Sequence, residues 1–85
     1  MCTGIVETTP VTGSGKGSKG WFKLDQACVS YDHPVDAQVE YALNIDFVNQ
    51  IDGPAARVAV ELSPESARKL AETILTTLAR GAETQ

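Results

Sequence analysis

The sequence predicts an α+β protein, a four-stranded antiparallel β-meander with one C-terminal amphipathic helix packed on one face (β-β-β-β-α). Three observations lead to this fold class. Apolar and polar residues alternate over residues 39–51 and again over 57–63, which is the period of half-buried strands. The DGPA sequence at residues 52–55 has the composition of a hairpin turn. Apolar residues then recur every three or four positions between 63 and 81, as on one face of a helix.

The first strand is predicted at residues 3–8, and the TGSGKGSKG sequence at 12–20 is predicted to be a flexible glycine-rich loop. Its glycines and lysines are suited to a phosphate, but a nucleotide P-loop needs G-x-x-x-x-G-K-[ST] before a helix. Pro10 takes the place of the first glycine, and Gly17 the place of the Ser or Thr. The following sequence is typical of a strand, so we expect a connection between strands. A lid ordered by a ligand is the alternative.

The second strand is predicted at residues 20–31, where the apolar residues change parity partway along. Phe22 and Leu24 share one parity, and Ala27 and Val29 share the other. Such a change indicates a β-bulge, which we expect at Asp25–Gln26. Residues 32–37, DHPVDA, are predicted to form a loop because proline disfavours a helical conformation at the preceding residue.

The third and fourth strands are expected to pair through the 52–55 turn, with one apolar face beneath the helix. That face is formed by Tyr41, Leu43, Ile45, Phe47, Val58, Val60 and Leu62. The opposite face carries Glu40, Ala42, Asn44, Asp46, Val48, Arg57, Ala59 and Glu61. This pairing is the strongest tertiary prediction that the sequence allows.

The C-terminal helix has recognisable ends. Ser63 is a good N-cap, Pro64 suits the first helical position, and Gly81 is expected to stop the helix in a left-handed conformation. The apolar stripe consists of Ala67, Leu70, Ala71, Ile74, Leu75 and Leu78.

Length and composition limit the classes of function. The 85 residues make one domain, 1–85, and carry 11 acidic against 7 basic residues, for a net charge of −4. This charge argues against nucleic acid, which attracts basic surfaces. No apolar run has the roughly 18 residues of a membrane span. The start of the chain does not resemble a secretory signal, and two cysteines suit free thiols, so a cytoplasmic location and no cofactor are predicted.

One helix can cover one face of a four-stranded sheet, and the other face is partly apolar. We therefore expect a homodimer with two-fold symmetry. Pairing of edge strands and packing of faces both remain open.

His33 is the histidine of the chain and the side chain best suited to proton transfer near neutral pH. As a catalytic residue it would act with Asp46 or Glu40; the alternative is a surface histidine that caps a turn. A structural zinc site needs four ligands, and one His with two Cys falls short, so no metal is predicted. Cys2 could be a free N-terminal thiol or simply begin a strand.

Four further side chains are candidates for binding a ligand: Trp21, Tyr31, Tyr41 and Arg57. The carboxylates of Glu40, Asp46 and Glu61 are expected on the face away from the helix. There they could share a proton, or be solvated and paired with Arg57.

The sequence resembles a family of small bacterial single-domain proteins of unassigned function. The resemblance extends over nearly the whole chain and is carried by the MCT start and by GWFKLDQA, YDHPVDA, ALNIDFVN and GPAARVAVELSPESARKL. It implies a compact stand-alone domain and no particular chemistry.

Two hypotheses of function follow. The first is a homodimeric module that binds a small molecule or a protein partner. The second is a small cofactor-independent lyase, isomerase or cyclase in which His33 transfers a proton. A concave setting for His33 near a carboxylate would favour the enzyme.

Overall fold

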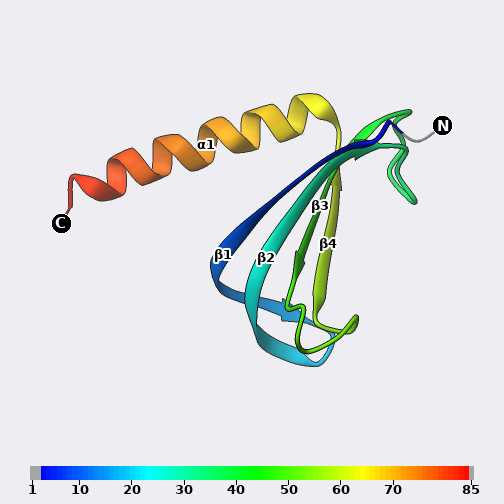
Figure 1. Cartoon of the computed structure of the whole chain (residues 1–85). Helices are drawn as coiled ribbons and strands as arrows, with labels where there is room; N and C mark the ends of the chain where they lie inside the picture. The colour runs from blue at the N-terminus through cyan, green and yellow to red at the C-terminus, as the bar shows by residue number, and fades with distance from the viewer. Residues whose placement is uncertain (1–2, 85) are drawn as a thin grey trace.

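The computed structural model describes residues 3–84 and has four strands and one helix (Figure 1). These elements are β1 (Ile5–Gly17), β2 (Gly20–Asp32), β3 (Ala42–Val48), β4 (Arg57–Leu62) and α1 (Pro64–Ala82). The strands form one antiparallel sheet in the order β1-β2-β3-β4. The α+β meander with a C-terminal helix is therefore confirmed.

β1 and β2 form a long hairpin, in which the glycine-rich segment is mostly strand. The first strand was expected to end at residue 8 and a loop to span 12–20. Instead β1 continues to Gly17, and the turn is limited to Ser18 and Lys19. Gly20 closes this turn with a φ of 107°, a value that suits glycine. Backbone pairing with β2, which needs no side chains, holds the segment extended.

The hairpin contains a register shift at the position where β2 changes parity. Pro10 pairs with Gln26, whereas Gly13 pairs with Leu24, so two residues of β1 lie opposite Asp25 alone. The irregularity was expected within β2 at Asp25–Gln26; the extra residue instead belongs to β1. β1 is an edge strand, where Pro10 costs no interior ladder hydrogen bond.

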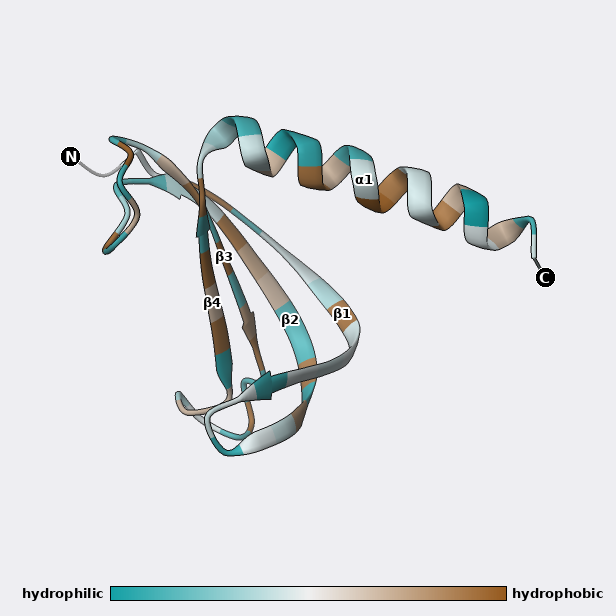
Figure 2. Ribbon diagram, turned by 180° about the vertical axis from the view of Figure 1, so that it is seen from behind, coloured by the Kyte–Doolittle hydropathy of each residue, from teal (hydrophilic) through white to brown (hydrophobic). Residues whose placement is uncertain are grey.

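Beyond this shift the sheet bends sharply, and the end of β1 approaches β4 (Figures 1 and 2). The closest approach is at Gly15, where an added Cβ would lie 3.2 Å from a Leu24 methyl and 3.3 Å from a Val58 methyl. Glycine therefore allows the strand to pass directly over these two side chains.

β3 is shorter than the predicted strand 39–51. It pairs with β2 from Ala42 to Val48 and with β4 from Leu43 to Val48. Asn49 ends it, because its backbone N–H donates to the Ala56 carbonyl at 3.0 Å and its Nδ2 donates to the Lys23 carbonyl at 2.9 Å. Residues 33–41 form an irregular segment, so Glu40 lies outside the strand on which it was expected.

Helix α1 begins as predicted and ends one residue later. The Ser63 hydroxyl accepts from the Ser66 N–H at 3.2 Å, and Pro64 occupies the first turn. Gly81 does not stop the helix: it lies within α1, and the cap is Glu83 in a right-handed conformation. The basic Arg80 in the last turn complements the helix dipole.

The helix leaves the sheet instead of lying across it. Its first turns face β3 and β4, and the rest projects beyond the strands (Figures 1 and 2). None of its described residues is buried. The core is correspondingly small and consists of Leu24, Ala27, Ala42 and Ala56. In the described part of the chain, α1 is too polar to be a transmembrane helix.

Candidate functional site

The angle between α1 and the sheet forms an apolar groove of about 510 Å³. We call this the helix–sheet groove. Its sheet wall is formed by side chains of β2, β3 and β4: Val29, Tyr31, Leu43, Ile45 and Leu62. Its helix wall is formed by Pro64, Ala67, Arg68, Leu70, Ala71 and Ile74. Arg68 contributes the one charge among these lining residues, so the groove suits an apolar occupant.

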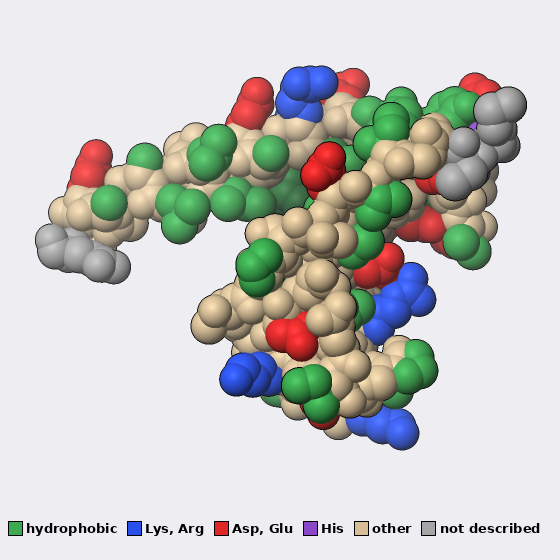
Figure 3. Space-filling model, in the orientation of Figure 1, with side chains coloured by type: hydrophobic (Ala, Val, Ile, Leu, Met, Phe, Trp, Pro, Cys, Tyr) green, Lys and Arg blue, Asp and Glu red, His purple; other side chains and the backbone are tan. Residues whose placement is uncertain are grey.

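The apolar stripe of α1 continues past the groove. Leu75 and Leu78, which we call the distal leucines, do not line it and are 68% and 65% exposed. In Figure 3 apolar side chains follow the underside of the projecting helix. The stripe is thus apolar along its length but is partly covered by the sheet only at its start.

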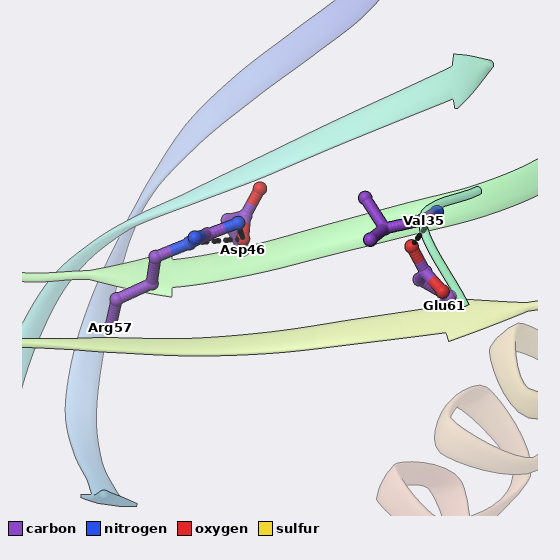
Figure 4. A network of polar contacts seen from close by, with 4 residues as sticks. All are labelled: Val35, Asp46, Arg57 and Glu61. Carbon is purple, nitrogen blue, oxygen red and sulfur yellow. Dashed lines mark hydrogen bonds and ion pairs between the residues drawn. The ribbon is translucent and has the colours of Figure 1, made fainter. Parts of the chain in front are cut away.

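The opposite side of the sheet carries a polar network in which Glu61 holds a loop (Figure 4). Its carboxylate accepts backbone N–H groups from Val35 at 2.6 Å, Asp36 at 3.0 Å and Ala37 at 3.0 Å. The hydrogen bonds from Val35, Ala37 and Asp36 stabilise the ionised form and lower the pKa of Glu61. Glu61 therefore ties the irregular segment 33–41 to β4.

His33 is oriented by its neighbours in the same segment. Its Nδ1 lies 2.8 Å from the Glu40 carbonyl, and its ring stacks on Tyr41 with centroids 4.6 Å apart. A carbonyl oxygen only accepts, so this contact places the proton on Nδ1 and leaves Nε2 as an acceptor in the neutral ring. Tyr41 also stacks on Tyr31 at 5.5 Å. The three rings make an aromatic row that runs from the loop to the rim of the helix–sheet groove.

His33 and Asp46 line one shallow hollow of about 280 Å³ on the polar face. Arg57 lines it as well and pairs with Asp46, with Nη2 and Nε at 2.6 Å and 2.7 Å from one carboxylate oxygen (Figure 4). Of the predicted catalytic residues, the structure brings His33 and Asp46 to one hollow. Glu40 is not among the lining residues, and its backbone carbonyl is what contacts His33.

The predicted ligand-binding residues do not form one site. Tyr31 and Tyr41 stack together, whereas Arg57 lies on the polar face. Trp21 is beside the β1–β2 turn, at the other end of β2, and is 70% exposed. Among residues 3–84, no group of three or more His, Cys, Asp or Glu side chains is arranged to hold a metal ion. Cys28 is half-buried with a free thiol, and Cys2 lies outside the described residues.

Two features of these sites were not predicted from the sequence. Glu61 was expected on the polar face, but its capture of three consecutive N–H groups depends on a loop 24 to 26 residues away. The exposure of the distal leucines was not predicted either. The periodicity of α1 identifies the apolar face of the helix, but it does not show which element packs against that face. The low pKa of Glu61 and this exposure are both tertiary properties.

The fold and the groove define a small α+β meander protein with an amphipathic terminal helix that its own sheet leaves largely uncovered. The chain belongs to the family of unknown function DUF6295, whose model matches residues 1–85. This confirms the predicted membership of a family without an assigned function; the bacterial origin stays a prediction. Neither the curated proteins nor the solved structures contain a match to the chain.

Proposed function

We propose that the protein is a non-catalytic binding module that acts as a homodimer, with the helix–sheet groove and the distal leucines as the dimer interface. The observation that carries the proposal is the uncovered apolar stripe of α1, which has no buried residue along its 19 positions. Amphipathic helices gain most of their stability by burying such a stripe. A second copy would supply the missing cover.

The exposed area of one chain supports this proposal quantitatively. The chain exposes 6539 Å², whereas a compact monomer of 9.0 kDa would expose about 4,850 Å². The surplus is about 1,700 Å², roughly twice the area that each partner buries in a standard-size protein interface. The radius of gyration of 14.3 Å likewise exceeds the roughly 12 Å of a compact domain of this length.

The aromatic row is the proposed contact surface for a small ligand or a further protein. Tyr41 and His33 lie outside the groove, so they would stay accessible when a second copy fills it. Stacked rings offer flat apolar faces with polar edges, which suit planar ligands. Trp21 lies beside the β1–β2 turn and is not part of this surface, whereas Arg57 lines the same hollow as His33. The proposed setting is the cytoplasm, as the sequence predicts.

The native mass of the full-length chain tests the proposal. Light scattering on the protein eluting from a sizing column should give twice the 9.0 kDa mass of one chain. Dilution below the dissociation constant should lower the measured mass towards the 9.0 kDa of one chain. A particle of 9.0 kDa at every concentration up to the millimolar range would contradict the homodimer.

A proton-transfer enzyme is the second candidate function, because His33 and Asp46 line one hollow and the His33 ring is held by the Glu40 carbonyl. An acceptor Nε2 beside a carboxylate-lined hollow is the arrangement of a general base. Such an enzyme would catalyse exchange of carbon-bound hydrogen for deuterium in a mixture of carbonyl metabolites in heavy water. Exchange that is lost in His33→Gln would favour the enzyme, whereas equal background rates would favour the binding module.

A further inference from the structure

We propose that the occupant of the helix–sheet groove is α1 of a second copy, so that each chain inserts its distal leucines into the groove of the other. This inference rests on the homodimer proposed above and specifies how the two chains meet. It places the contact on α1 and the groove, whereas the sequence leaves open pairing of edge strands and packing of sheet faces. The partner of the groove is thus an amphipathic helix of the chain's own sequence.

The groove and the helix are complementary in shape. On the helix wall of the groove, Pro64, Ala67 and Ala71 are small, and small residues let a second helix approach closely. The distal half of α1 is the matching projection, since Leu75 and Leu78 extend past the residues that line the chain's own groove. Helix α1 has 19 residues and is therefore about 28 Å long, enough to reach from one chain into another.

The two surfaces are also complementary in chemistry. The groove carries a single charged side chain, Arg68, and the distal leucines carry none. Glu65 and Lys69 of the helix form an ion pair with each other and are not among the lining residues of the groove. Apart from Arg68, an apolar stripe entering this groove would cover no charged side chain, so little desolvation of charge opposes the contact.

Two-fold symmetry would allow both apolar surfaces of both chains to be buried in one interface. Each chain has both a groove and a projecting stripe, so one symmetric contact would cover both in both copies. A small apolar ligand in the groove would leave the distal leucines in water, because they lie outside it. A second helix therefore accounts for the surplus exposed area of the chain better than a small molecule does, because the helix would cover both the groove and the distal leucines.

The edges of the sheet are poor alternatives for dimerisation. β1 contains Pro10 and the register shift, two features that discourage pairing at an edge. β4 has only six residues, Arg57–Leu62, and its neighbouring loop is held by Glu61. Neither edge would cover the exposed stripe of α1.

Isotope-filtered NMR on an equimolar mixture of ¹³C-labelled and unlabelled full-length chains tests the inference, since it reports contacts between chains only. We expect intermolecular contacts from the methyl groups of Leu75 and Leu78 to those of Leu43, Ile45 and Leu62. A dimer whose intermolecular contacts instead join strand β1 to β1, or β4 to β4, would overturn the inference and leave the homodimer standing. A monomer would overturn both.

A matched pair of variants gives an independent test by native mass. Leu78→Glu should be monomeric at concentrations where the natural chain is dimeric. Thr76→Glu adds the same charge two residues away on the opposite face of the helix and should remain dimeric. Dimers of equal stability for both variants would overturn the inference, as would loss of the dimer in both.

The milder Leu78→Ala keeps helix propensity in case Leu78→Glu does not fold. Its dimer dissociation constant should rise on the order of tenfold or more, because two buried leucines are truncated per dimer. An unchanged constant would contradict the inference. Circular dichroism on each variant shows whether α1 is retained.

Discussion

At the scale of single residues, the carboxylate of Glu61 has the most defined role. It receives three consecutive N–H groups of the 33–41 segment, and these hydrogen bonds lower its pKa. A carboxyl whose pKa falls on folding stabilises the folded state above its unfolded pKa, which is about 4.3. This contribution is lost as the pH falls through the lower folded pKa.

We therefore expect the amide proton shifts of Val35, Asp36 and Ala37 to titrate together, with a midpoint below the ordinary glutamate pKa. In Glu61→Gln the group has no charge to lose, so this common titration should be absent. The free energy of unfolding should also fall less steeply in acid for the variant. NMR titration and urea unfolding at several pH values measure both effects. Independent midpoints for the three amides would contradict the role of Glu61.

Gly15 is a second residue whose identity the fold restricts. Strand β1 passes over Leu24 and Val58 at this position and leaves little room for a side chain. Gly15→Val should destabilise the fold by about 1–3 kcal/mol, the usual cost of overpacking. Gly13→Val is the matched control, since no atom lies within 4 Å of a Cβ placed there. Urea unfolding compares the two, and equal stabilities would show that the close approach is absent.

At the scale of elements, predictability follows from side-chain periodicity. β3, β4 and α1 were predicted because Leu43 and Ile45, Val58 and Val60, and the helix stripe alternate at the periods of their elements. The second half of β1 has no such period, since its residues GSGKG offer almost no apolar side chains. Pairing with β2 makes it a strand, and pairing is a tertiary property that a single segment does not encode.

The end of α1 offers a test at this scale. Gly81 lies inside the helix with a right-handed conformation, and no atom would clash with an added Cβ. Gly81→Ala should therefore raise the free energy of unfolding by about 0.5–1 kcal/mol. Urea unfolding at matched concentration measures the change. A loss of stability would mean that Gly81 needs the left-handed conformation that the sequence predicts.

At the scale of the whole molecule, a chain of 85 residues depends on additional burial, because the core within residues 3–84 is formed only by Leu24 and three alanines.

The predicted catalytic residues are only partly brought together by the fold. His33 and Asp46 line one hollow because the 33–41 loop and strand β3 both contribute to the polar side of the sheet. Of the candidate ligand-binding residues, Tyr31 and Tyr41 stack on each other, Arg57 lines the hollow with His33, and Trp21 lies at the other end of β2; their role in binding stays a prediction.

If folding and dimerisation are coupled, stability must depend on protein concentration. A tenfold increase in chain concentration should add about 1.4 kcal/mol per dimer to the apparent stability and raise the urea midpoint. Unfolding curves followed by circular dichroism at three concentrations measure this shift. Superimposable curves would indicate that the single chain is the stable unit.

The central claim is that the distal leucines are covered in the native particle, and their access to water tests it most directly. A soluble paramagnetic agent broadens methyl signals in proportion to their exposure, and Val35 and Ile51, at 98% and 89% exposure, provide references in the same sample. We predict that the Leu75 and Leu78 methyl signals remain sharp at agent concentrations that remove those of Val35 and Ile51. Equal broadening of all four would show that the stripe is open to water and would contradict the account.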